Sequence, residues 1–273
     1  MAQLLKQPAR LAAAARVLVE TGIVRIERPD KALASARELL RWKMTPAAAF
    51  VVSAARYPDD MAIVDERGTL TFAEVHRRTN ALARSLADEG IAEDDGVAIM
   101  CRDHRWFIEA TVALSKLGAT ALFFNTAFAG PQLQEVTERE DPAGIAYDEE
   151  FAELVGEAAG DRRRWVGWHD GESAHDTTLE GLIDAGDDAD VEVPDRTGRI
   201  VLLTSGSTGT PKGASRGQPE VVEPLVAVFS RIPLRAREPT FFAGPPLPRL
   251  GLSPVQPGPA ALLHLRAAAQ VRP

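Results

Sequence analysis

Short apolar runs alternate with helix-type segments from residue 61 onward, and this alternation constrains the fold more than any other feature of the chain. The runs Val97–Met100 and Ala121–Phe124 are continuously apolar, which is typical of parallel strands buried on both faces. Between them, residues 106–117 have the apolar spacing of a helix that ends near Gly118. Strands that alternate with helices of this length predict a layered α/β fold with a largely parallel sheet.

The alternation also predicts an order of elements. Runs at 62–65 and 69–72, separated by Glu66-Arg67-Gly68, indicate a β-hairpin. The acidic, turn-rich stretch 170–197 predicts only a surface connection. The other expected elements are helix 72–86, helix 133–139, strand 144–147, helix 151–159 and strand 165–168.

A further apolar run, Ile200–Leu203, leads directly into the loop Thr204-Ser-Gly-Ser-Thr-Gly-Thr-Pro-Lys-Gly213, which holds three glycines, five hydroxyl residues and a lysine. Glycines let a backbone approach a ligand closely, and consecutive backbone N–H groups form an anion-binding nest. Hydroxyl groups and the Lys212 ammonium can donate hydrogen bonds to phosphate oxygens. A strand followed by this loop therefore predicts a triphosphate site.

This loop differs from the Walker loop, which ends in Gly-Lys-Ser/Thr and runs into a helix. Here Pro211 precedes Lys212, and Gly213 follows it. Proline removes a donor and disfavours helix at the preceding residue, so we expect a less helical loop. Composition alone also fits a flexible linker, but the ordered string after a buried strand is far more specific than its composition.

The string T-S-G-S-T-G-T-P-K-G resembles the signature phosphate loop of the adenylate-forming (AMP-binding) superfamily of acyl-CoA synthetases, luciferases and nonribosomal peptide adenylation domains. The resemblance covers residues 45–243 and includes Gly68–Glu74 and Gly96–Arg105. Asn125–Gln132 and Gly213–Pro219 are similar to actinobacterial-type fatty-acid–CoA ligases. The implied fold is the front part of the N-terminal domain of such an enzyme, with a helical leader.

The resemblance implies ATP-dependent fatty-acid–CoA ligase chemistry. A carboxylate attacks the α-phosphate of ATP, which gives an acyl-adenylate and pyrophosphate, and the thiol of coenzyme A then displaces AMP. ATP, Mg²⁺ and coenzyme A are the implied cofactors. The residues that the resemblance assigns to the β- and γ-phosphates, with magnesium, are Thr204, Ser205, Gly206, Ser207, Thr208, Gly209 and Lys212. They would stabilise charge and position the leaving pyrophosphate, and none of them is a nucleophile.

Residues 1–44 are expected to form an amphipathic helical leader, with a second helix that starts after Asp30. Two interpretations of residues 1–43 stay open: peripheral contact with a membrane surface, or a helical pair packed on the main domain. No run of eighteen apolar residues is present in the sequence.

The formal net charge of −8 argues against nucleic-acid binding, which needs a basic face. Cys101 is the single cysteine, so the chain forms no internal disulfide, which fits a cytoplasmic protein. Because Cys101 ends an apolar run, it is expected to be a buried strand residue rather than a nucleophile. His104 and Arg105 begin the following helix, and a functional role, helix capping and surface solvation all stay open for them.

The tail 244–273 contains no Asp, Glu, Lys, Ile, Phe, Tyr or Trp and has seven prolines, which predicts irregular structure. We interpret it as an out-of-frame translation. Codons for L-F-H-A-W-G-F, read in a shifted frame, give Leu247–Leu252, and codons for S-T-F-V-L-R-R-R-F-D-P give His264–Pro273. The first of these unshifted peptides resembles the gating segment of the family, and the second resembles the strand that follows it. A natural proline-rich tail is the alternative.

Without the downstream gating histidine, adenine-binding strand and C-terminal lysine, the chain holds no catalytic residue of the family and is expected to be truncated and inactive alone. Two further interpretations stay open: a non-catalytic nucleotide-binding or interaction fragment, and an intact ligase of another acid.

Overall fold

The computed structural model describes Arg16 and residues 29–171, 176–204, 212–215, 239–242 and 264–267. These residues fall into two compact units. The first holds residues 29–74 with the two short C-terminal segments, and the second holds residues 75–171, 176–204 and 212–215. Residues 1–15 and 17–28 of the leader and most of the tail after residue 243 lie outside the described residues.

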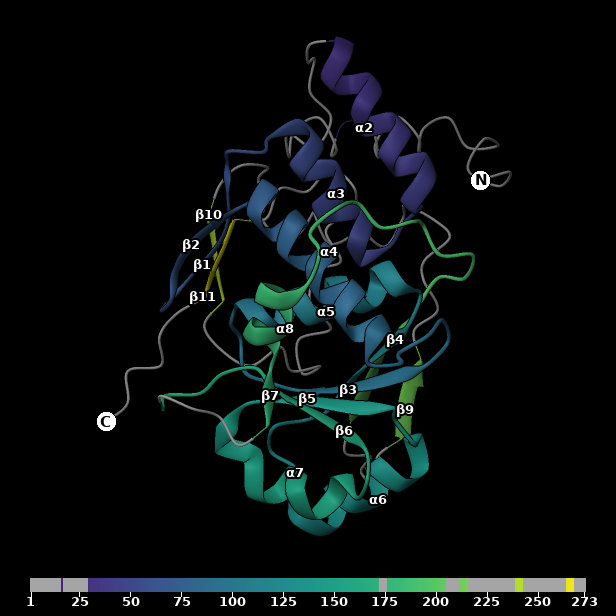
Figure 1. Cartoon of the computed structure of the whole chain (residues 1–273), viewed down its shortest axis with the longest axis vertical. Coiled ribbons are helices and arrows are strands. Elements are labelled where there is room, and N and C mark those ends of the chain that lie inside the picture. Colours follow the sequence, from purple (N-terminus) through teal and green to yellow (C-terminus); the bar gives the residue numbers. More distant parts are fainter. Residues whose placement is uncertain are drawn as a thin grey trace. The chain divides into compact units, whose positions relative to one another are not determined.

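Two helices open the first unit, α2 (Pro29–Trp42) and α3 (Pro46–Arg56) (Figure 1). The predicted helix after Asp30 is thus present. Thr45 caps α3, because its Oγ1 accepts a hydrogen bond from Ala48 N at 3.1 Å, and Pro46 occupies the first turn, where its missing N–H costs nothing.

A four-stranded sheet completes the first unit, in the order β10-β11-β1-β2. The predicted hairpin is confirmed: β1 (Met61–Asp65) pairs antiparallel with β2 (Gly68–Thr71). The strands β10 (Pro239–Phe242) and β11 (His264–Ala267) pair in parallel, so part of the tail forms a strand although irregular structure was expected there. Residues 264–267 contain no proline, so the backbone donors of β11 are available for a ladder.

The second unit is built on a seven-stranded sheet in the order β7-β6-β5-β3-β4-β8-β9. All neighbouring strands are parallel except β8 and β9, which confirms the largely parallel α/β prediction. The strands are β3 (Gly96–Met100), β4 (Thr120–Phe123), β5 (Gly144–Tyr147), β6 (Arg163–Val166), β7 (Thr177–Thr178), β8 (Ile200–Thr204) and β9 (Lys212–Ser215).

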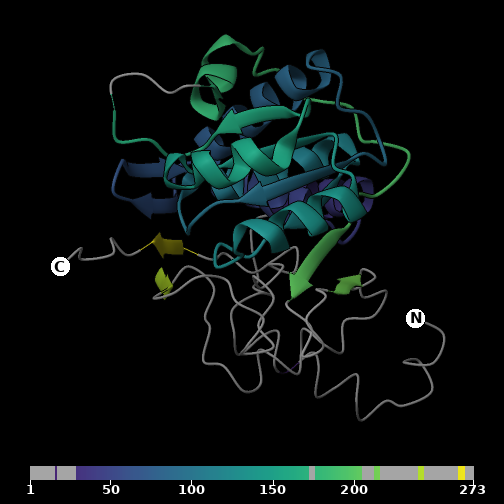
Figure 2. The same ribbon diagram turned by 90° about the horizontal axis from the view of Figure 1, so that it is seen from below.

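Helices cover both faces of this sheet, with α4, α5 and α8 on one face and α6 and α7 on the other (Figure 1; Figure 2 shows α6 and α7 in teal). Successive side chains of β3 therefore enter different cores: Val97 and Ile99 pack with α4, α5 and α8, whereas Ala98 and Met100 pack with α6 and α7. The helices are α4 (Phe72–Asp88), α5 (Arg105–Leu117), α6 (Gly130–Glu140), α7 (Ala152–Ala159) and α8 (Leu179–Ala185).

The stretch 170–197 is more than the surface connection that its acidic composition predicted. It contains β7 and α8, and the side chains of Leu179, Leu182 and Ile183 are buried in the core. The three apolar residues lie on one face of a helix of seven residues, which was too short for the periodicity to stand out among the surrounding acidic residues.

Candidate functional site

The carboxyl ends of the parallel strands meet at one edge of the large sheet, and ligands of open α/β sheets bind outside this edge. Strand β8 reaches the edge beside β4 with Val201, Leu202 and Leu203 all buried. Just before β8 pairs with β4, the backbone at Gly198 passes very close to Ala119. Only glycine fits there, because a Cβ at residue 198 would lie 1.9 Å from the carbonyl oxygen of Ala119.

The predicted phosphate loop begins at this edge. Thr204 ends β8, Lys212 begins β9, and the two residues are paired across the antiparallel ladder. The loop therefore leaves the sheet and returns to it at the same point. After the loop the chain continues into strand β9 and not into a helix, as expected for a loop that differs from the Walker type. Residues 205–211, with five of the predicted ligands, lie outside the described residues; only the backbones of Thr204 and Lys212 are described.

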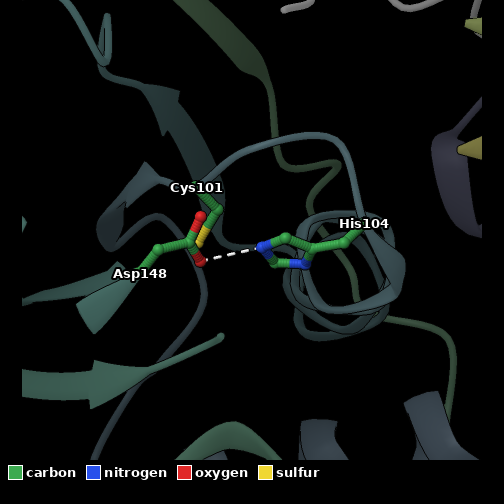
Figure 3. Close-up of side chains that lie close together, drawn as sticks. All are labelled: Cys101, His104 and Asp148. Carbon is green, nitrogen blue, oxygen red and sulfur yellow. Dashed lines mark hydrogen bonds and ion pairs between the residues drawn. The ribbon is translucent and has the colours of Figure 1, made fainter. Parts of the chain in front are cut away.

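A second group of polar residues lies at the topological switch point of the same edge. The connection after β3 runs through α5 to β4, whereas the connection after β5 runs through α7 to β6 on the opposite side. Cys101 directly follows β3, Asp148 directly follows β5, and His104 immediately precedes α5. Their side chains converge in a buried cluster (Figure 3).

Asp148 is the centre of this cluster. Its Oδ1 lies 2.8 Å from Nε2 of His104 and accepts a hydrogen bond from Trp168 N at 3.1 Å. Its Oδ2 accepts a hydrogen bond from Arg102 N at 2.6 Å. Burial, with the nearby Asp148 carboxylate, raises the pKa of the Cys101 thiol well above its usual value. The thiol is therefore protonated and a poor nucleophile, and the predicted burial of Cys101 is confirmed.

His104 and Arg105 are both buried, so surface solvation, one of the roles left open for them, is wrong. His104 stands at the N-cap of α5, but its side chain makes no capping hydrogen bond and points to Asp148 instead. Its ring also packs against Trp106 and Trp168, with centroids 5.5 and 5.6 Å away. The cluster carries no sequence signal, because Asp148 is 44 residues from His104 and only the parallel pairing of β3 and β5 brings them together.

Other buried charges link helices on the α4 face of the sheet. The Arg78 guanidinium of α4 binds both carboxylate oxygens of Glu109 on α5, at 2.6 and 3.1 Å, and both of Glu180 on α8, at 2.8 and 2.6 Å. Trp106 Nε1 donates a further hydrogen bond to Glu180 at 2.7 Å. This network joins α4, α5 and α8 and holds them together on one face of the sheet.

Lys116 of α5 is fully buried, and its ammonium donates hydrogen bonds to His76 O, Thr79 Oγ1 and Asn80 Oδ1 at 2.9, 2.8 and 2.5 Å. All three acceptors belong to α4. Burial lowers the pKa of Lys116 from 10.5 to about 7, and the Asp190 carboxylate opposes the shift. Lys116 ties α5 to α4 and contacts no residue of the predicted loop that the structure describes.

Comparison with known proteins identifies the family. The sequence profile described as AMP-binding enzyme matches residues 50–246, well over half of the chain. The chain belongs to this AMP-binding enzyme family. Its relatives include adenylate-forming acid–CoA ligases.

Three relatives illustrate the match. A feruloyl-CoA synthase of Amycolatopsis is 29% identical over 197 residues, which is 71% of this chain and 38% of the relative. A medium/long-chain-fatty-acid–CoA/3-oxocholest-4-en-26-oate–CoA ligase of Mycobacterium tuberculosis is 26% identical over 166 residues, 57% of this chain and 30% of the ligase. The inhibitor-bound N-terminal domain of FACL13 from Mycobacterium tuberculosis superposes with a TM-score of 0.71 at 22% identity, over 84% of this chain and 58% of that one.

The aligned part of the chain thus spans well under half the length of the two sequence relatives. Among the residues that the structure describes, no helix is long and apolar enough to cross a bilayer.

Proposed function

We propose that the chain carries the phosphate-binding part of an ATP-dependent fatty-acid–CoA ligase. One observation supports this most: the predicted loop is anchored at both ends on the carboxyl edge of the parallel sheet, by the Thr204–Lys212 pair. A loop held in this way returns the lysine to the start of the glycine- and hydroxyl-rich segment, so backbone N–H groups, hydroxyls and one ammonium can surround a phosphate chain.

In this proposal the loop holds the β- and γ-phosphates of ATP while a fatty-acid carboxylate oxygen attacks the α-phosphorus. The bond from the α-phosphorus to the bridging oxygen breaks, and pyrophosphate leaves with its charge stabilised by Lys212 and by the N–H and O–H donors of residues 204–209. Mg²⁺, when bound, would share the neutralisation of the phosphate charge. The coenzyme A thiol would then attack the acyl carbon and release AMP.

Two classes of carboxylic acid are candidates for the substrate. The segment Asn125–Gln132, similar to fatty-acid–CoA ligases, and the mycobacterial relative support a fatty acid. The feruloyl-CoA synthase relative gives an aryl acid as the second candidate. An enzyme assembled from the gene in the corrected frame decides between them, because its kcat/KM for dodecanoate should exceed that for ferulate. The reverse order would favour the aryl acid.

We further infer that the 273-residue chain alone forms no acyl-CoA, since its aligned part spans only 38% of the feruloyl-CoA synthase and 30% of the mycobacterial ligase. Phosphate contacts alone would leave the α-phosphate unoriented. Acyl-CoA production above background by the purified chain would overturn this inference. Sequencing the gene through codons 235–273 tests the out-of-frame tail, because a shifted frame that reads L-F-H-A-W-G-F at 247–252 is expected.

Calorimetry with Mg·ATP tests the phosphate site directly. We expect the Lys212→Gln variant to bind about 10–100-fold more weakly, since a hydrogen bond to a charged group contributes about 1.5–3 kcal/mol. Lys43→Gln is the matched control, because Lys43 is exposed and lies outside the loop. Folded wild-type chain that binds no Mg·ATP, or equal binding by both variants, would refute the proposal. Binding without turnover also fits a non-catalytic nucleotide-binding fragment.

We place this chemistry in the cytoplasm, where ATP and coenzyme A are available, with peripheral membrane contact through the leader. Leu33 and Leu40 of α2 support that contact, because 74% and 82% of their surfaces are exposed. Co-sedimentation with anionic vesicles tests it. A Leu33→Gln/Leu40→Gln variant should sediment less than the wild-type chain, and equal sedimentation would favour a packed helical pair.

A further inference from the structure

The buried cluster at the switch point has the composition of a metal site. One potential ligand atom from each of Cys101, His104 and Asp148 lies within 4.8 Å of the other two. The exposed fractions of these residues are only 4%, 5% and 2%. One thiol, one imidazole and one carboxylate are the three donor types that zinc takes in proteins, and sites with three protein ligands complete their tetrahedron with water.

The surroundings hold the carboxylate in place. Two backbone N–H groups, those of Arg102 and Trp168, donate to opposite oxygens of Asp148, and carboxylates that bind metals are typically oriented by such hydrogen bonds from the outer layer of the site. The second ring nitrogen of His104, Nδ1, is buried and has no hydrogen-bond partner in the described part of the chain. If Nε2 takes a metal, the proton of the neutral imidazole lies on Nδ1.

Gly167 leaves space where the three side chains meet. A Cβ at this position would lie 3.1 Å from Asp148 Oδ1, 3.2 Å from Cys101 Sγ and 3.5 Å from His104 Cε1. Because Gly167 has no side chain, all three candidate ligands lie close to its backbone at once. A larger residue there would crowd the cluster, whereas glycine leaves the ligands free to adjust around an ion.

The charge balance also favours a dication. The Asp148 carboxylate is held by backbone N–H groups and His104, while the guanidinium of Arg102 extends to Glu150 at 2.8 Å. Burying a carboxylate is costly unless it is paired and hydrogen-bonded, and a bound dication would add a cationic partner to the hydrogen bonds that Asp148 already makes. When Zn²⁺ binds, the Cys101 thiol releases one proton to solvent, and the thiolate, the carboxylate and the dication sum to zero charge.

We propose that Cys101, His104 and Asp148 bind one zinc ion that fastens the ends of β3 and β5 to the start of α5. Such a site is separate from the ATP chemistry of the phosphate loop. It would fix the switch point of the sheet, and its ligation can be measured without nucleotide or acid.

Cobalt substitution of the wild-type chain gives the sharpest test. The chain is stripped with EDTA and titrated with Co²⁺, and a thiolate–cobalt charge-transfer band in the near ultraviolet should saturate at one equivalent. Because Cys101 is the only cysteine, this band reports that residue alone. Added Zn²⁺ should abolish it. Folded wild-type chain that shows no such band and retains no zinc after gel filtration would overturn the proposal.

Variants locate the ion. Cys101→Ser and His104→Gln should each weaken Zn²⁺ binding at least ~100-fold, more than the ~10–100-fold that changes in the outer layer cost. His169→Gln is the matched control and should bind zinc as the wild-type chain does, since His169 lies outside the cluster. Unchanged zinc affinity in a folded Cys101→Ser variant would place the metal elsewhere and refute the assignment. If a variant does not fold, the cobalt titration of the wild-type chain still decides.

Discussion

The Arg78 network offers a prediction whose size follows from burial. Arg78→Met removes four hydrogen bonds and leaves the Glu109 carboxylate, whose side chain is 0% exposed, without its cation. Breaking a buried ion pair from one side typically costs about 3–5 kcal/mol. Glu180 is 36% exposed, so its share is smaller, and Glu180→Gln should cost below ~1 kcal/mol.

Urea unfolding followed by circular dichroism measures these changes. The double variant Arg78→Met/Glu109→Met buries no unpaired carboxylate, and we expect it to recover at least half of the stability that the single variant loses. In thermal unfolding, the single variant should melt on the order of 10 °C lower. A loss below ~1 kcal/mol for Arg78→Met, or a double variant no more stable than the single one, would refute the reasoning.

The same variant has a characteristic pH dependence. Burial raises the pKa of Glu109 in the folded chain, and Arg78 opposes this shift, so removal of Arg78 raises the pKa further. An acid whose folded pKa exceeds its unfolded value loses stability as pH rises from the unfolded pKa through the folded one. The deficit of Arg78→Met should therefore be larger at pH 8 than at pH 5, and a deficit independent of pH would exclude Glu109 as its source.

Two further predictions concern single residues. Gly198→Ala should lower the melting temperature and weaken Mg·ATP binding, because the new Cβ would lie 1.9 Å from Ala119 O and push β8 away from β4. Gly156→Ala is the control, since its Cβ would meet only Arg164, at 3.6 Å. Equal melting temperatures for the two variants would contradict this account. Lys116 loses its proton near pH 7 when folded and near 10.5 when unfolded, so stability in urea should rise between these pH values by up to ~1.4 kcal/mol per unit, and Lys116→Met should flatten the rise. A flat wild-type profile would mean that the three acceptors on α4 hold the ammonium against burial.

Local patterns predicted most of the sheet and its helices correctly, because parallel strands buried on both faces must be continuously apolar. The runs that became β3, β4 and β8 show this most clearly. The helix α8 was missed, since seven residues give too little periodicity to stand out among acidic neighbours. Strand β11 was missed because nearby prolines dominated the composition of the tail.

The sequence by itself determined the α/β class, the order of most elements and the family, because an ordered phosphate-loop string after a buried strand carries its meaning locally. Only the tertiary structure decided which distant residues share a site. It paired Thr204 with Lys212 at the base of the loop, and it brought Asp148 to Cys101 and His104 at the switch point. The physical reason is that strand order and register set these neighbours, and neither can be read from the spacing of residues along one chain.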